Sequence, residues 1–297
     1  MTKTQETRTI RHLLGWAIIT LKNSNIEFPN SNAETLLSHT LSCDRIELYR
    51  DPEKILGTVD IRKYNRLIAQ RVKHVPLQYI LGHTEFMSLD FVVDERVLIP
   101  RHETELLVET ALEKIKNEAF SKKNFTLVDI GTGSGAIAIS LARNLQDIQV
   151  YASDISRDAL DVAEMNAGNL MVEQKVNLLL GDLFDAFDGK LEKGSIDCIV
   201  SNPPYVKEAE LFCLQPEIRD HEPRTALVAG EEGLFYLNRL VDGAPEWLRP
   251  DGFLLLEIGE TQAESVTKRM EKGGHYINIQ IVQDMQKKDR IVSAKRR

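Results

Sequence analysis

The sequence predicts an α/β protein in which a small all-helical domain and a β-hairpin linker precede a mostly parallel sheet. Segments with helical periodicity fill residues 1–75, and strand-like runs alternate with helix-like runs from Phe125 onward. The last two strand-like runs are joined only by a short polar segment, Asp284 to Asp289. Alternation implies right-handed crossovers and parallel strands, whereas a short connection permits a hairpin and therefore an antiparallel edge.

Seven strands are predicted in the carboxy-terminal part of the chain. Short apolar runs bounded by turn residues indicate the strands, and a period of 3.6 residues indicates the helices between them. The strands are expected at residues 126–130, 148–153, 176–180, 196–201, 252–258, 277–282 and 290–294. Helices are expected from Ser156 to Asn169, from Glu231 to Leu248 and from Thr261 to Lys272.

Changes in this pattern suggest the domain boundaries. Residues 1–75 contain no glycine-rich loop and no cluster of possible ligands, so we expect a helical domain that docks the substrate. Pro76 ends the last of these helices. Residues 76–99 are expected to form the hairpin linker, and residues 100–297 the catalytic domain. The two linker strands are expected at residues 78–82 and 91–93, around a turn near Met87 and Ser88.

The composition excludes several classes of protein. A chain of 297 residues with 42% hydrophobic and 28% charged residues is typical of an ordered globular protein with more than one domain. The formal net charge of -8 disfavours binding to a phosphate backbone. Three cysteines without C-x-x-C spacing indicate a reducing compartment, and no apolar run is long enough to span a bilayer. We therefore expect a cytoplasmic monomer without a metal site.

A glycine-rich turn, Gly131 to Gly135, lies between a predicted strand and a helix start. Glycines let the backbone approach a ligand closely, and the amino end of a helix favours an anion. The turn alone also satisfies the looser dinucleotide fingerprint through Gly131, Gly133 and Ala136. Asp154 ends the next predicted strand, where a carboxylate would bind ribose hydroxyls in either case.

Asp129, just before the glycine turn, favours S-adenosylmethionine over a nicotinamide cofactor. Its carboxylate would repel a pyrophosphate, because unscreened like charges a few ångströms apart cost on the order of a few kcal/mol near a protein surface. The same carboxylate suits the ammonium of the methionine part of S-adenosylmethionine. Asp182, after the third strand, is placed to contact adenine, and Leu183 to pack on its ring. The predicted cofactor-binding residues are thus Asp129, Gly131, Thr132, Gly133, Ser134, Gly135, Asp154, Asp182 and Leu183.

The segment Asn202-Pro203-Pro204-Tyr205 follows a run that is typical of a buried strand. Two prolines cannot donate ladder hydrogen bonds, so the strand ends there and a stiff turn begins at its carboxyl end, where open α/β sheets bind ligands. The Asn202 side-chain oxygen and the Pro203 carbonyl could accept both hydrogens of a substrate amide, while Tyr205 packs against its plane. Asn202, Pro203, Pro204 and Tyr205 are therefore predicted as the catalytic residues of an enzyme that methylates a planar, weakly nucleophilic nitrogen.

Over nearly its whole length, the sequence resembles the N(5)-glutamine methyltransferases of peptide-chain release factors, the HemK/PrmC family. Besides the glycine turn and the proline turn, five groups of residues carry the resemblance. They are Pro-Leu-Gln-Tyr-Ile-Leu-Gly at 76–82, Leu-Ile-Pro-Arg at 98–101, Glu-Thr-Glu at 103–105, Glu-Pro at 222–223 with Ala-Leu at 226–227, and Glu-Ile-Gly at 257–259 with Gln262. Two positions differ from the family pattern. His102 stands where members usually have proline, and Leu183 stands where some members have an aromatic residue.

The resemblance implies a Rossmann-like class I methyltransferase sheet of seven strands with an antiparallel edge. It implies S-adenosylmethionine as cofactor, with Asn202 also contacting it, and the Gly-Gly-Gln loop of a release factor as substrate. No direct contact with nucleic acid or membrane is expected.

Two other functions stay open on sequence alone. A methyltransferase acting on an exocyclic amine of adenine or guanine in nucleic acid would share the proline turn and the cofactor. It would also need a basic, aromatic-bearing surface, against which the acidic balance argues. A cofactor-binding protein that has lost catalysis is the third class, and the intact residues 202–205 argue against it.

Overall fold

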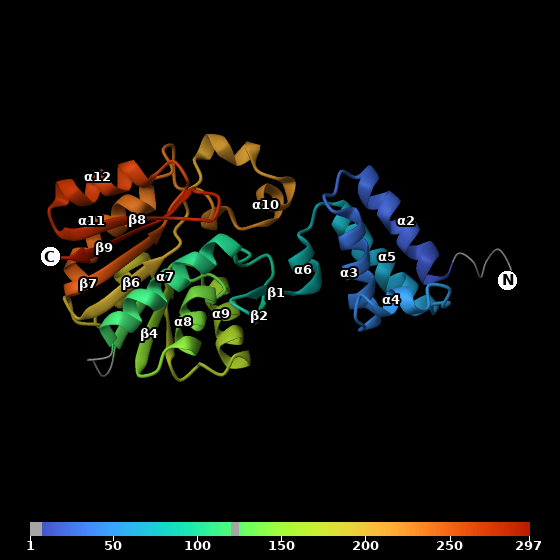
Figure 1. Ribbon diagram of the computed structural model, residues 1–297, viewed down its shortest axis with the longest axis horizontal. Helices are drawn as coiled ribbons and strands as arrows, with labels where there is room; N and C mark the ends of the chain where they lie inside the picture. The colour runs from blue at the N-terminus through green and yellow to red at the C-terminus, as the bar shows by residue number, and fades with distance from the viewer. Residues whose placement is uncertain (1–7, 120–124) are drawn as a thin grey trace. The chain divides into compact units, whose positions relative to one another are not determined.

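The computed structural model describes residues 8–119 and 125–297 (Figure 1). These residues divide into two compact units. The first runs up to Gly82 and includes Gln215–His221, and the second comprises His83–Leu214 and Glu222–Arg297. Within the described residues, no helix has both the length and the apolar character needed to cross a membrane.

The first unit is helical, as its periodicity predicts. Its core contains the apolar faces of the three longest helices, including Leu13, Leu36, Tyr64 and Ile68. Its helices are α2 (Ile10–Asn23), α3 (Pro29–Leu41), α4 (Glu47–Arg50), α5 (Thr58–Val72), α6 (Leu77–Leu81) and α10 (Pro216–His221).

A buried arginine connects α10 to the rest of this unit. Arg71 donates to Asn32 Oδ1 at 2.7 Å, to the Val75 carbonyl at 3.2 Å and to Glu217 Oε1 at 2.9 Å. His74 also contacts Glu217, at 3.3 Å. A segment far along the sequence therefore belongs to the helical unit, and no local pattern in the sequence indicates this.

The prediction of a strand at residues 78–82 is wrong. Leu77–Leu81 form helix α6, whose apolar side chains pack on the helical core, and Gly82 ends it with a left-handed φ of 83°. Helical contacts with the core thus outweigh the strand-like composition of this run. The hairpin follows directly as β1 (His83–Phe86) and β2 (Leu89–Val92), and its turn at Met87 and Ser88 is confirmed.

All seven predicted strands of the main sheet are present, in the order β5-β4-β3-β6-β7-β9-β8. The first five in sequence pair in parallel, whereas β9 is antiparallel to both of its neighbours, β7 and β8. They are β3 (Phe125–Ile130), β4 (Ile148–Asp154), β5 (Val176–Leu180), β6 (Ile196–Ser201), β7 (Leu248–Glu257), β8 (Tyr276–Gln283) and β9 (Asp289–Arg296). The expected class I methyltransferase topology with an antiparallel edge is confirmed.

Helices cover both faces of this sheet (Figure 1). Alternate residues of each central strand enter different cores, so that Leu127 packs with the helices of one face and Val128 with those of the other. Burial on both faces explains why the strand sequences are almost continuously apolar. One face carries α7 (His102–Ala119), α8 (Ala136–Asn144) and α9 (Arg157–Asn169), and the other carries α11 (Phe235–Trp247) and α12 (Ala263–Gly273).

Candidate active site

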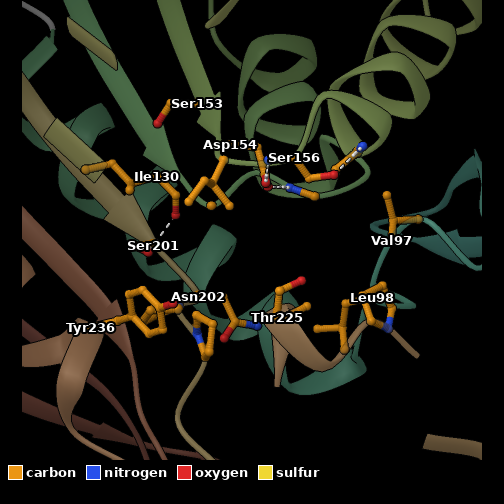
Figure 2. A pocket seen from close by; sticks show the side chains of 18 of the residues that line it. Val97, Leu98, Ile130, Ser153, Asp154, Ser156, Ser201, Asn202, Thr225 and Tyr236 are labelled. Carbon is orange, nitrogen blue, oxygen red and sulfur yellow. Dashed lines mark hydrogen bonds between the residues drawn. The ribbon is translucent and has the colours of Figure 1, made fainter. Parts of the chain in front are cut away.

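A cavity opens at the carboxyl ends of the parallel strands, entirely within the second unit (Figure 2). Its empty volume is about 820 Å³ when the open space at its mouth is included. The loops after β3, β4, β5 and β6 all contribute to its lining. This is where an open α/β sheet binds its ligand.

The glycine turn forms the start of this lining. Gly131, Gly133 and Gly135 have φ values of 75°, 55° and 82°, a left-handed conformation that favours glycine. A Cβ on Gly135 would lie 2.7 Å from Ile139 Cδ1, inside the first turn of α8. The turn thus brings backbone, rather than side chains, against the cavity beside the amino end of a helix.

Asp154 shapes this turn and also lines the cavity. Its Oδ2 accepts a hydrogen bond from Gly133 N and its Oδ1 one from Ser156 N, both at 2.9 Å. Burial raises the pKa of the carboxyl, and the backbone donors act in the opposite direction. Figure 2 shows Asp154 beside Ser156 on the wall formed by β4 and α9. The carboxylate is placed to accept from the hydroxyls of a ribose.

Asp129 is fully buried and does not line the cavity. Its Oδ2 accepts from Thr132 Oγ1 at 2.7 Å and from Ala138 N at 3.2 Å. Burial raises the pKa of this carboxyl to about 7, although these two hydrogen bonds act to lower it. Among the described residues, its Oδ1 has no hydrogen-bond partner. Because this oxygen is buried behind the glycine turn, Asp129 could act on the ammonium group of S-adenosylmethionine through its charge and not by direct contact.

The loop after β5 supplies the next part of the lining, through Asp182 and Leu183. Arg239 of α11 holds the Asp182 carboxylate with contacts of 2.9 and 3.3 Å. Leu183 has a left-handed φ of 50°. A Cβ on Gly181 would lie 2.6 Å from Ala186 Cα, so the backbone packs closely against the short helix that follows. The residues expected to contact adenine therefore lie at the cavity wall.

The proline turn forms the wall after β6, through Asn202, Pro203 and Pro204. Ser201 Oγ donates to the Ile130 carbonyl at 2.6 Å and connects the turn to the end of β3. The Asn202 side-chain nitrogen donates to Thr104 Oγ1 at 3.0 Å. This contact occupies the nitrogen and leaves the amide oxygen as the group able to accept from a ligand.

Tyr205 packs behind the turn against the core between the sheet and α11, and it is not among the residues lining the cavity. Burial raises the pKa of its hydroxyl to about 12. Its carbonyl accepts from Gln262 Nε2 at 3.2 Å, and the same nitrogen donates to the Gly233 carbonyl at 3.0 Å. Gln262 Oε1 accepts from Gly259 N at 2.9 Å. One buried side chain thus connects three loops around the turn.

An ion pair fixes the segment that faces the proline turn. Arg101 Nη2 donates to both carboxylate oxygens of Glu222, at 2.8 and 2.7 Å. Burial raises the pKa of Glu222, and Arg101 opposes that rise. The next residue, Pro223, lines the cavity. The Arg101 and Glu222 charges are therefore part of the framework of the site.

The structure brings most of the predicted residues to one place. Eight of them line the cavity: Gly131, Gly133, Asp154, Asp182, Leu183, Asn202, Pro203 and Pro204. The other five, Asp129, Thr132, Ser134, Gly135 and Tyr205, lie behind its surface. No group of three or more His, Cys, Asp or Glu side chains among the described residues could hold a metal ion.

Comparison with known proteins agrees with this arrangement. The family model of the PrmC N-terminal domain matches residues 12–82, and that of the methyltransferase small domain matches residues 103–216. A release factor glutamine methyltransferase of Geobacter sulfurreducens is 40% identical over 295 residues, covering 99% of both chains. The one of Moorella thermoacetica is 41% identical over 289 residues, covering 97% of this chain and 99% of the relative. The chain belongs to the release factor glutamine methyltransferase family.

Solved structures share the fold of this family member at much lower identity. The hMettl16 catalytic domain in complex with a 3′UTR hairpin aligns with a TM-score of 0.55 and 14% identity, covering 77% of this chain and 81% of the other. The T. thermophilus 16S rRNA methyltransferase RsmC, in complex with AdoMet and guanosine, aligns with a TM-score of 0.50 and 17% identity, covering 72% and 50%. These likenesses concern the fold alone.

The sequence did not predict several residues that line the cavity of this protein. Arg96 and Val97 come from the segment between the hairpin and α7, Thr225 from the loop after Glu222, and Tyr236 from α11. Figure 2 shows Val97, Thr225 and Tyr236 among the side chains around the cavity. Only the neighbouring family segments at 98–101 and 222–227 gave a signal near them. Tyr236 had none, because it lies within an ordinary amphipathic helix.

Proposed function

We propose that this protein transfers a methyl group from S-adenosylmethionine to the side-chain amide nitrogen of the glutamine in the Gly-Gly-Gln loop of a peptide-chain release factor. The observation that carries this proposal is the orientation of Asn202. Its nitrogen is held by Thr104, so its oxygen is the group that can accept a hydrogen bond at the end of β6. Family membership supports the same activity.

The cofactor is S-adenosylmethionine, which when bound supplies an activated methyl group on a sulfonium. The carboxylate of Asp154 binds the ribose hydroxyls, and the backbone of Gly131 and Gly133 approaches the methionine part. Asp129 provides negative charge behind the turn. Asp182 and Leu183 bound the adenine region. All of these residues except Asp129 line one cavity, which supports these roles.

The substrate glutamine is held by the proline turn. The Asn202 oxygen and the Pro203 carbonyl accept the two amide hydrogens, which fixes the nitrogen and increases its electron density. S-adenosylmethionine would supply the electrophilic methyl group, and Asn202 and Pro203 would hold the amide nitrogen toward it. The N-methylated cation is strongly acidic and loses its proton to water, so the chain needs no strong base. Alignment of this kind accounts for about 7–11 kcal/mol in well-oriented reactions.

Tyr205 supports the turn from behind. Its ring packs against the core and its carbonyl is held by Gln262, so the backbone of Pro203 and Pro204 is stiff. Tyr205 was expected to pack against the plane of the substrate amide, but its ring packs against the core and does not line the cavity, so we propose a positioning role in which it keeps the two acceptors in place. A rigid pair of acceptors binds a planar amide with little loss of entropy on binding.

The helical unit docks the release factor away from its Gly-Gly-Gln loop. Large apolar side chains are exposed on this unit, among them Ile19, Phe28, Ile46 and Val59. These side chains are available for contact with a protein partner. The protein acts as a monomer in the cytoplasm and has no direct contact with nucleic acid. The acidic net charge supports the absence of nucleic-acid contact, and the spacing of the cysteines supports the cytoplasmic location.

The test is a transfer assay with labelled S-adenosylmethionine and purified protein. The acceptors are an intact release factor, the same factor with its loop glutamine changed to alanine, RNA, and DNA. Label in the intact factor alone is the expected result. Label in RNA or DNA would identify a base methyltransferase instead, and no label in any acceptor would indicate a binding protein without this activity.

A further inference from the structure

Two residues outside the predicted site lie directly behind Asn202. Thr104 is in the first turn of α7, and Glu257 is the last residue of β7. Strands β6 and β7 are parallel neighbours, with Ser201 paired to Leu256. Asn202 and Glu257 each follow directly, so both come to the same end of the sheet. The Thr104 hydroxyl accepts a hydrogen bond from the Asn202 side-chain nitrogen, and it lies close enough to the Glu257 carboxyl to lower its pKa.

Hydrogen-bond polarity makes this chain directional. The Thr104 oxygen accepts from Asn202, which leaves its single hydrogen available, and the neighbouring Glu257 carboxylate can only accept it. The Thr104 oxygen then has only lone pairs to offer, and it must face a donor. The Asn202 amide meets that requirement only with its nitrogen toward Thr104, at 3.0 Å. Its oxygen is thereby directed away from Thr104 and is available to the cavity.

We infer that Thr104 and Glu257 are positioning residues that fix the orientation of the Asn202 carboxamide for the substrate amide. The inference rests on the proposed function for its consequence, and on this hydrogen-bond chain for its geometry. Neither residue touches the cavity. Both act through Asn202.

Burial makes the arrangement sensitive to the charge of Glu257. The side chain is almost completely buried, and among the described residues its Oε2 has no hydrogen-bond partner. Burial raises the pKa of this carboxyl to about 7, and Glu103 adds to the rise. Thr104, Arg290 and Arg101 act in the opposite direction. Tyr205, which is partly buried, does not ionise in this range because its pKa is about 12.

Protonation of Glu257 means that the hydrogen bonds from Asn202 through Thr104 to Glu257 no longer have a fixed direction. A carboxylic acid can donate to Thr104, whose own hydrogen is then free to reach the Asn202 oxygen. The amide then has two acceptable orientations, one of which turns the oxygen away from the substrate. Turnover should therefore rise with pH through the pKa of Glu257, near 7.

The kinetic test uses the full chain with a release factor as acceptor. Thr104→Val should lower kcat about 10-fold, since one oriented hydrogen bond is lost, and should leave the affinity for S-adenosylmethionine unchanged. Thr104→Ser keeps the hydroxyl and should restore most of kcat. Glu257→Gln should lower kcat and remove its rise near pH 7. Thr110→Val is the matched control, because Thr110 lies on the same helix and its hydroxyl only donates to the Leu106 carbonyl.

A second measurement does not depend on activity. In ¹⁵N-labelled protein, the side-chain NH₂ resonance of Asn202 is identified by its loss in Asn202→Asp. In the unsubstituted protein this resonance should shift as Glu257 titrates near pH 7, and the shift should disappear in both Thr104→Val and Glu257→Gln.

An unchanged shift in Thr104→Val, or full kcat in that variant, would overturn the inference while leaving the proposed function intact. If the unsubstituted protein methylates no release factor, the proposed function fails, and the NMR titration still decides whether the chain orients Asn202.

Discussion

Replacement of Gln262 by methionine should destabilise the catalytic unit and lower its turnover. Methionine keeps the volume of the side chain but removes three hydrogen bonds, to Gly259 N and to the carbonyls of Tyr205 and Gly233. Gln262 is buried, with 6% of its surface exposed, so water cannot easily replace these bonds. At about 1 kcal/mol for each bond, the free energy of unfolding should fall by roughly 3 kcal/mol. Loss of the Tyr205 contact should also reduce kcat.

The assay is urea unfolding followed by the fluorescence of Trp247, which is buried in the same unit. Replacing Trp16 by phenylalanine in all variants removes the signal of the helical unit. The control is Gln280→Ala, which removes one exposed hydrogen bond to Lys114 on the same unit and should change the unfolding free energy by less than about 0.5 kcal/mol. A loss below about 1 kcal/mol for Gln262→Met would refute the view that this side chain holds the three loops together.

Three further predictions concern the cavity and the buried carboxyl behind its glycine turn. Asn202→Ala should reduce methyl transfer by at least about 10-fold, because the oriented acceptor is lost. Calorimetry should show a nearly unchanged affinity for the cofactor. A parallel loss of affinity would mean that Asn202 mainly binds the cofactor. Asp154→Ala should weaken S-adenosylmethionine binding about 10-fold or more, because a carboxylate facing the ribose and a support of Gly133 are both removed; equal affinity in the two proteins would exclude that role. For Asp129, a folded pKa near 7 lies above the ordinary value of 3.8, so the folded state binds more protons between them. Its contribution to stability should therefore fall as the pH rises from about 4 to 7, and Asp129→Asn should flatten this part of the unfolding curve measured against pH.

The positions of the strands could be read from the sequence because each strand is buried on both faces. Short apolar runs such as residues 196–201 are typical of strands buried on both faces, and turn residues mark their ends. The pairing of the last two strands also followed from their short connection. That β9 inserts between β7 and β8 did not, because strand order depends on which edges meet in space.

The errors have a related cause. Residues 78–82 look like a strand, but the helical core on which Leu77, Ile80 and Leu81 pack selects a helix. The expected start of a helix at Thr261 was also wrong, since α12 begins at Ala263. In both cases contacts with distant residues decided a local conformation that propensity alone left close to balanced.

By itself, the sequence determined the class of the sheet, the glycine turn, the proline turn and the family, because each depends on residue types at short, fixed spacings. Only the tertiary structure decided that Asp129 and Tyr205 lie behind the cavity, that Arg71 recruits a distant segment to the helical unit, and that Thr104 and Glu257 stand behind Asn202. The physical reason is that burial and hydrogen-bond direction arise between residues far apart in the sequence, such as Arg71 and Glu217, 146 positions apart, which only the folded chain brings together.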